Sequence, residues 1–194
     1  DRFPGTEITA TMTCAGNRRS EHSRVKKVGG VQWAAGPIGN ARWGGVRLAD
    51  VLKFAGLKAS AKHVWFESID EVEKSGRTFP FGGSIPIAKS LEKTGQGNGA
   101  LLATTMNGGP LPADHGYPVR TVVPGYVGAR SVKWLGRIVV SDRPSLNHYV
   151  ANAYKLVTKG DDQEWAAAKP IYKFPVNSAI CNPAAGAKVP SGKI

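Results

Sequence analysis

The chain has 194 residues and carries 26 Lys and Arg against 14 Asp and Glu, which gives a formal net charge of +12. Apolar residues make up 41% and charged residues 21%, enough for one ordinary domain with a buried core, so a wholly disordered chain is excluded. No run approaches the roughly 20 apolar residues that cross a bilayer, and no basic and then apolar leader opens the chain. The positive charge favours anionic ligands or partners.

The chain contains only two cysteines, Cys14 and Cys181. Two are too few for a disulfide framework in a chain of this length, and no CxxC or HExxH pattern offers a zinc site. Each cysteine therefore needs its own explanation. The chain begins at Asp1 without a methionine and enters a strand-like pattern within a few residues. We expect it to be a piece of a longer protein whose N-terminal part is missing.

The first elements are predicted from the spacing of apolar residues. Residues 8–14 alternate apolar side chains with threonines, the period of a half-buried strand, and residues 15–17 read as a turn. Residues 46–55 place apolar side chains three and four apart and predict a helix. Gly56 stands where a helix C-terminus favours a left-handed residue.

The rest of the chain predicts short elements, because 24 glycines and 13 prolines interrupt it throughout. Strand-like runs cover residues 63–69, 120–123, 132–140 and 176–180, and a turn is predicted at 107–110. Residues 141–170 show no clear pattern, so we expect loops there with a short helix at 162–168. The composition thus favours many short strands and a few short helices.

Residues 14–19 place a thiol at a strand end, beside a glycine turn and next to Arg18 and Arg19. Neighbouring positive charge favours the thiolate, which is a nucleophile and a ligand for soft metals. The alternative is that Cys14 is a small buried apolar residue and that the arginines are solvated. The spacing alone leaves both interpretations open.

A second group of candidates lies between residues 114 and 134. Small residues there allow a backbone to approach a ligand, and His115, Arg120 and Lys133 can donate hydrogen bonds to a phosphate-like anion. The alternative is that Arg120, Arg130 and Lys133 form the exposed face of two strands. Trp33 alone is more typical of core packing. The other histidines, His22, His63 and His148, show no metal-ligand spacing and are interpreted as structural.

Several motifs then occur in a fixed order: CAGNRR at 14–19, ARWGGVRL at 41–48, MNGGPLP at 106–112, DHGYPVR at 114–120, VVPG at 122–125 and VGARSVKWLGRI at 127–138. Together, over roughly residues 9–183, they resemble the molybdenum-cofactor domain of the sulfite oxidase family, which also contains assimilatory nitrate reductases. The resemblance implies an α+β, sulfite oxidase-type molybdopterin-binding fold with mixed β-sheets and short helices. Residues 1–175 would form most of that domain, and 176–194 would begin an immunoglobulin-like dimerisation domain.

The resemblance also implies the site. Cys14 would be the thiolate ligand to molybdenum, a soft donor for that metal. Arg19 would pair with an oxyanion substrate, and Trp33 would shape the pocket wall. The residues that would hold the molybdopterin and its phosphate are Asp70, His115, Arg120, Ser131, Val132 and Lys133. Thr104 stands where sulfite oxidases are expected to carry a pocket tyrosine, so we expect a proton-donating or gating phenol to be missing.

The implied function is oxidation of sulfite to sulfate at molybdenum, with electrons passed to a cytochrome that is another protein or a missing domain. A homodimer and a periplasmic location are expected of the parent protein. A sulfane dehydrogenase subunit or a nitrate reductase-type enzyme is the alternative within the family. A basic nucleic-acid-binding module is the non-enzymatic alternative, suggested by the pI of about 9.9, although no reader motif is present. A remnant that binds no cofactor is a third possibility.

Overall fold

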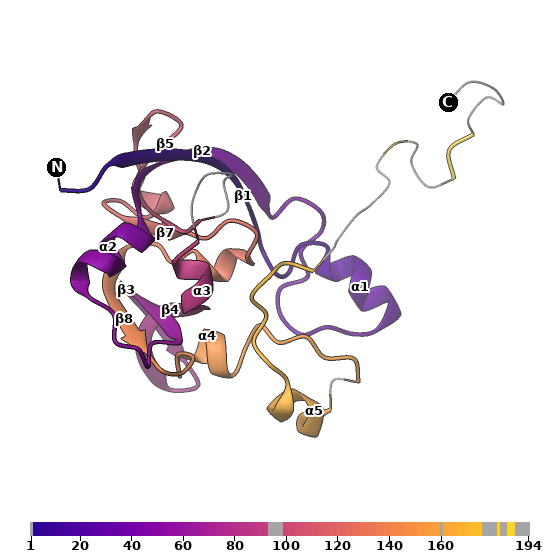
Figure 1. Ribbon diagram of the computed structural model, residues 1–194. Coiled ribbons are helices and arrows are strands. Elements are labelled where there is room, and N and C mark those ends of the chain that lie inside the picture. The colour runs from indigo at the N-terminus through magenta and orange to yellow at the C-terminus, as the bar shows by residue number, and fades with distance from the viewer. Residues whose placement is uncertain (1, 93–98, 160, 176–181, 183–185, 189–194) are drawn as a thin grey trace.

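The computed structural model describes residues 2–92, 99–159, 161–175, 182 and 186–188. Two antiparallel sheets form its body (Figure 1). The first has the order β1-β2-β5-β6, with β7 paired to β5, and the second has the order β4-β3-β8. The first sheet consists of β1 (Gly5–Thr13), β2 (Ile38–Arg47), β5 (Leu101–Met106), β6 (Gly109–Pro110) and β7 (Arg120–Val122). The second consists of β3 (His63–Lys74), β4 (Arg77–Pro86) and β8 (Leu135–Ser141).

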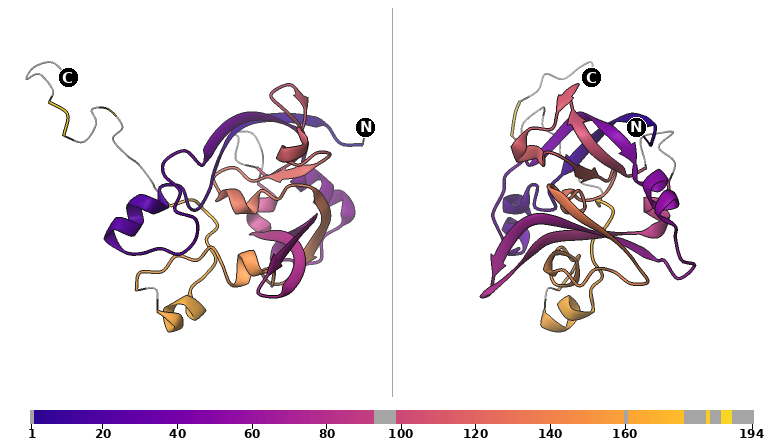
Figure 2. Two further views of the ribbon diagram at one scale, coloured as in Figure 1. Left: turned by 180° about the vertical axis from the view of Figure 1, so that it is seen from behind. Right: turned by 90° about the vertical axis from the view of Figure 1, so that its left-hand side faces the viewer.

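The helices are short. They are α1 (Arg19–Val25), α2 (Leu48–Ala55), α3 (Ile87–Ser90), α4 (His148–Ala151) and α5 (Asp162–Ala167), with 3-10 turns η1 (Ala113–His115) and η2 (Gly128–Arg130). The sheets occupy separate layers, while α1 and α5 project from the body on the same side (Figure 2). The predicted α+β class with short helices is confirmed. The expected mixed sheets are antiparallel in every pairing that the structure describes, as the tight β3–β4 connection at Ser75–Gly76 requires for that pair.

Most predicted elements are present, with shifted ends. The strand over 8–14 is β1, and the strands over 63–69 and 120–123 are β3 and β7. The helix predicted from 46 begins at Leu48, because Val46 and Arg47 continue β2. The strand predicted from 132 begins at Leu135, because the left-handed φ of 48° at Trp134 interrupts the extended chain. The predicted helix near 162 is α5.

Sequence reasoning missed β2, β4 and β5. In β2, Gly44 and Gly45 break the apolar alternation. Gly45 is required by close approach, since a Cβ there would lie 2.0 Å from the Leu102 carbonyl oxygen of β5. The buried Leu101–Leu102–Ala103 run of β5 gives no period-2 pattern at all. The strand predicted at 176–180 and Cys181 fall outside the described residues.

Two apolar clusters hold the layers together. One packs α2 against the second sheet, with Leu48, Val64 and Phe66 each fully buried. The other fills the inner face of the first sheet around Trp43 and Leu101. Neither cluster contains a residue of η1 or η2, so these turns are ordered by other contacts.

Candidate active site

Cys14 follows β1 directly and begins the predicted turn. Its N–H donates to the Pro37 carbonyl over 2.9 Å, and the Asn17 N–H donates to the Cys14 carbonyl over 2.9 Å. The Gly16 N–H lies 3.3 Å from the half-buried sulfur and donates to it. This backbone donor holds the sulfur in a fixed position at the start of the turn. The thiol is thus held at the strand end with one side open to a ligand.

Arg19 and Trp33 lie beside this turn. The Arg19 guanidinium donates from Nη1 to the Val31 carbonyl over 2.8 Å. It also covers Gly16, where a Cβ would come within 2.6 Å of Nη2, so this approach requires glycine. The Ser20 N–H donates to the Trp33 carbonyl over 3.0 Å. Trp33 is 46% exposed, which rules out the core-packing alternative for it in this chain.

Tyr154 is a site residue that sequence reasoning missed. Burial raises the pKa of its phenol, electrostatic interactions with Cys14 and Tyr149 raise it further, and Arg130 and Arg19 act in the opposite direction. The phenol therefore lies within electrostatic range of Cys14 and Arg19. It comes from the 141–170 region, which has no periodic pattern. The expectation of a missing phenol concerned the position of Thr104, whereas Tyr154 comes from a different part of the chain.

Thr104 lies elsewhere. It is exposed on β5, opposite the Gly44/Gly45 bulge of β2, and Gly44 in turn pairs with Glu7 of β1. Cys14 is seven residues further along β1 than Glu7. At about 3.3 Å per residue this is on the order of 23 Å. Thr104 instead borders a separate hollow of about 690 Å³ near the N-terminus of the described chain. The structure does not bring it to Cys14.

His115, Lys133 and Asp70 gather at the edge formed by η1 and the start of β8. Lys133 donates from Nζ to the Asp114 carbonyl over 2.7 Å. The Ile69 N–H donates to the Trp134 carbonyl over 2.8 Å, which brings the middle of β3, where Asp70 follows Ile69, to the same edge. His115 and Asp70 are exposed and Lys133 is half-buried. These side chains are accessible to an anionic or hydrogen-bonding ligand.

Arg120 is buried, with only 5% of its surface exposed. It donates from Nη1 to the His115 carbonyl over 2.8 Å, and from Nη2 to the Ser131 carbonyl over 3.1 Å and to the Met12 sulfur over 3.4 Å. Its guanidinium carbon lies 5.1 Å from the centre of the Trp43 ring. Burial lowers the Arg120 pKa to about 10. Arg120 therefore supports the backbone under the site rather than forming an exposed strand face.

Ser131 and Val132 are buried beside it. The Ser131 hydroxyl accepts a hydrogen bond from the Val123 N–H over 3.0 Å, and the Val132 N–H donates to the Thr121 hydroxyl over 2.7 Å. These bonds fix the strand-like stretch that leads to Lys133. The two residues thus order the wall behind the exposed donors.

Cys14 suits a metal whose other ligands are supplied by the cofactor that carries it. Across the described ranges, no group of three or more His, Cys, Asp and Glu side chains is placed to hold a metal ion. The role that the resemblance implies for Cys14 needs one soft thiolate and no such group. Glycine spacing supports close approach to this point, since a Cβ on Gly128 would lie 3.1 Å from the Thr13 carbonyl oxygen. The residues present fit a molybdenum–molybdopterin group.

Comparison with known proteins identifies the family of this chain. The family model described as the oxidoreductase molybdopterin binding domain matches residues 1–149. The chain belongs to this family. It is 45% identical over 198 residues to rat mitochondrial sulfite oxidase, with 100% of this chain and 35% of that protein covered. It is 40% identical to the sulfite oxidase of Arabidopsis thaliana, with 99% and 50% covered, and 38% identical to the NADPH nitrate reductase of Fusarium oxysporum, with 93% and 20% covered.

Among solved structures, the sulfane dehydrogenase SoxCD from Paracoccus pantotrophus is similar, with a TM-score of 0.67 and 30% identity over 89% of this chain and 40% of that one. The predicted family, its fold class and its molybdenum–molybdopterin cofactor are confirmed at the level of the family. The chain spans about a third of the length of the rat protein. No helix in the described part of the chain is both long and apolar enough to cross a membrane.

Proposed function

We propose that this chain is the cofactor-binding part of a molybdenum enzyme that oxidises sulfite, with Cys14 as the thiolate ligand to the metal. The Cys14 thiol at the end of β1, with the Gly16 N–H directed at its sulfur, is the observation that carries the proposal. The similarity to sulfite oxidases supports it. When bound, the cofactor supplies two-electron oxygen-atom transfer, and the protein holds and tunes it.

The chain's own residues then divide the work of holding the cofactor. His115, Lys133 and Asp70 would hold the pterin and its phosphate through charge-assisted hydrogen bonds. Arg120 acts behind them, because its donors hold the carbonyls of His115 and Ser131 in place. Ser131 and Val132 order the strand-like stretch that leads to Lys133.

The part of the site that contacts the substrate is formed by Arg19, Trp33 and Tyr154. The Arg19 guanidinium has a planar fork that suits an oxyanion, and only its Nη1 is engaged by a carbonyl among the described residues. Tyr154 stays protonated at neutral pH because burial raises its pKa, so its hydroxyl can donate a hydrogen bond to the same anion. Trp33 limits the pocket on the exposed side. Together they orient an oxyanion and exclude part of the water.

The partners follow from this proposal. They are a sulfite anion and a cytochrome acceptor, and the parent protein is a homodimer through a domain that begins at 176–194, located in the periplasm. Two observations support other substrates of the same centre, since a nitrate reductase is among the relatives and a sulfane dehydrogenase among the structural neighbours. A sulfur substrate remains the main proposal, because sulfite oxidases match with higher identity.

The test begins with the longest native form of the protein. We expect about one molybdenum per chain by elemental analysis and sulfite-dependent reduction of cytochrome c. Nitrate and a sulfane-bearing protein, assayed under the same conditions, distinguish the alternatives. Absence of molybdenum from the well-folded protein would contradict the proposal, and a salt titration against nonspecific DNA would then test the nucleic-acid-binding alternative.

Cys14→Ser is the decisive variant. It exchanges one sulfur for oxygen, so we expect loss of sulfite turnover with unchanged circular dichroism, because serine is a hard and poor ligand for this metal. Cys181→Ser makes the same atomic change at the other cysteine and serves as the matched control. Full turnover in Cys14→Ser would refute the assignment of the ligand.

A further inference from the structure

Arg130 is the largest fully buried side chain of the described residues, with 0% of its surface exposed. Its Nη1 donates to the Tyr149 carbonyl over 2.7 Å. Its Nε and Nη2 both donate to the Ile171 carbonyl, over 3.0 and 2.8 Å. No carboxylate in the described part of the chain forms an ion pair with it. A buried cation is thus balanced by backbone carbonyls of two distant segments, a costly arrangement that calls for an explanation.

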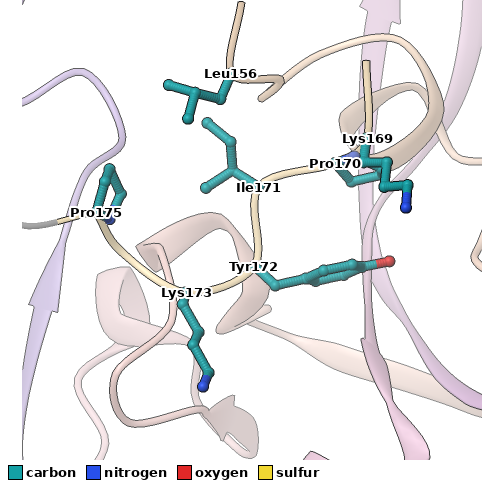
Figure 3. Close-up of a pocket in the computed structure, with 7 residues that line it drawn as sticks. All are labelled: Leu156, Lys169, Pro170, Ile171, Tyr172, Lys173 and Pro175. Atoms are coloured by element: carbon teal, nitrogen blue, oxygen red, sulfur yellow. The ribbon is translucent and has the colours of Figure 1, made fainter. Parts of the chain in front are cut away.

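Both carbonyls belong to the surroundings of Tyr154. The Ile171 N–H donates to the Tyr154 carbonyl over 2.7 Å, so the Ile171 peptide group joins Arg130 to the Tyr154 backbone. Figure 3 shows this segment passing Leu156, whose side chain faces that of Ile171, at the border of a hollow of about 290 Å³. The Arg130 guanidinium carbon also lies 6.0 Å from the Tyr154 ring centre and 5.4 Å from that of Tyr172.

The backbone of Tyr154 needs such support. Its φ is 52°, in the left-handed region that residues other than glycine rarely adopt. Such a conformation costs free energy and persists only where neighbouring contacts fix it. The contacts to the Ile171 peptide group and the guanidinium supply that constraint. Without them, the backbone of Tyr154 would lose the contacts that fix the direction of its phenol.

The other end of the same 3-10 turn touches the strand end that carries Cys14. A Cβ on Gly128 would lie 3.1 Å from the Thr13 carbonyl oxygen and 3.8 Å from the Cys14 nitrogen. One three-residue turn, η2, therefore contacts the backbone of the thiol at Gly128 and the segment of the phenol at Arg130. This is a direct physical connection between the two groups.

We propose that Arg130 is a positioning residue that holds the carbonyls of Tyr149 and Ile171 and thereby fixes the left-handed backbone of Tyr154 and the direction of its phenol. An arginine suits this task because its planar fork donates to two carbonyls at once, which a lysine ammonium on a flexible stem does not reproduce. The effect on turnover rests on the proposed function, whereas the effect on the backbone does not.

Hydrogen exchange in the full-length protein tests the structural part. We expect the Ile171 amide to exchange at least about tenfold faster in Arg130→Met, and less so in Arg130→Lys, while the amides of β3 and β4 keep their protection. Arg137→Met removes an exposed arginine of β8 and is the matched control. If Arg130→Met does not fold, Arg130→Lys carries the test. An unchanged Ile171 amide, or equal acceleration along the whole chain, would overturn the proposal.

A double-mutant cycle tests the functional part. In the holoenzyme, Arg130→Lys is expected to lower kcat for sulfite about tenfold with little change in KM, and to cause no further loss in a Tyr154→Phe background. The same fold loss in both backgrounds would show that Arg130 does not act through Tyr154. If the protein oxidises no sulfite, the proposed function fails, while the exchange experiment still decides whether Arg130 holds the segment.

Discussion

The β3–β4–β8 sheet and the region around Cys14 are held in place by different kinds of contact. In the sheet, backbone ladders pair β3 with β4 across a tight connection and with β8 from a distant part of the chain, over a core that includes Phe66. Around Cys14 the chain runs through turns, and buried arginines donate to the carbonyls of these turns. Where a ligand site prevents regular pairing, side chains thus take over the hydrogen bonds that a ladder would provide.

This difference also concerns charge. The sheet carries its ion pair on the surface, between Arg137 and Glu67 over 2.6 Å. The site region buries Arg120 and Arg130 at 5% and 0% exposure and satisfies them with neutral oxygens. Buried positive charge in this region favours anionic groups in the site. We therefore expect damage to the sheet to act on folding, and damage to the arginines to act on the site as well.

Removing core volume from the sheet is expected to have the largest effect on folding. Phe66 is 0% exposed, and Phe66→Ala should reduce the free energy of unfolding by about 3–5 kcal/mol through lost burial and the remaining cavity. Denaturant unfolding of the full-length protein measures it. Residual folded enzyme should keep its turnover per molybdenum, and a selective loss of turnover would contradict the division between the two regions.

Arg120→Met is expected to have the second largest effect. It leaves the carbonyls of His115 and Ser131 without their donor, at a cost of about 2–3 kcal/mol. Because these carbonyls border the cofactor cradle, molybdopterin content should fall along with stability. Arg120→Lys keeps the charge and serves as the control. Wild-type cofactor content in Arg120→Met would show that this arginine only supports the fold.

The pH dependence of the free energy of unfolding should show the contribution of two histidines, His63 and His148. Burial lowers the pKa of His63, and burial with a smaller contribution from Lys74 lowers that of His148. The unfolded chain therefore binds more protons than the folded one as pH falls below about 6.5, so stability is full above that pH and decreases below it.

Urea unfolding at pH 7.5 and 5.5 measures this loss. The His63→Gln, His148→Gln double variant should lose less stability between the two values than the wild type. The exposed His22 provides the control, since His22→Gln should leave the difference unchanged. An identical loss in the double variant would mean that other groups cause the dependence.

The smallest effect is expected at Thr104. Because the structure places Thr104 far along the sheet from Cys14, Thr104→Tyr should leave kcat and KM for sulfite unchanged. Steady-state kinetics of the holoenzyme measure both. A clear rise in turnover would restore the sequence-based interpretation, in which a phenol at this position completes the pocket.

Local patterns explain which elements could be predicted. The alternation in β1 and the glycine after α2 are properties of short stretches of chain, and both are confirmed. The strands β2 and β5 were not predicted, because glycines in β2 and continuous burial in β5 remove the alternation of apolar and polar side chains. The sequence left a ligand role and an exposed strand face open for Arg120 and named only the exposed face for Arg130. Their burial was not predicted, because it depends on segments distant in sequence.

Short-range patterns predicted the family motifs, the thiol at the end of a strand, and the short strands and helices, because each depends on neighbours a few residues away. Long-range contacts determine that every described strand pairing is antiparallel, that the Tyr154 phenol lies within electrostatic range of Cys14, that Thr104 lies far along the sheet, and that two arginines are buried on backbone carbonyls. The physical reason is that a left-handed tyrosine in an unpatterned loop takes its position from distant partners, here Arg130 and the Ile171 peptide group.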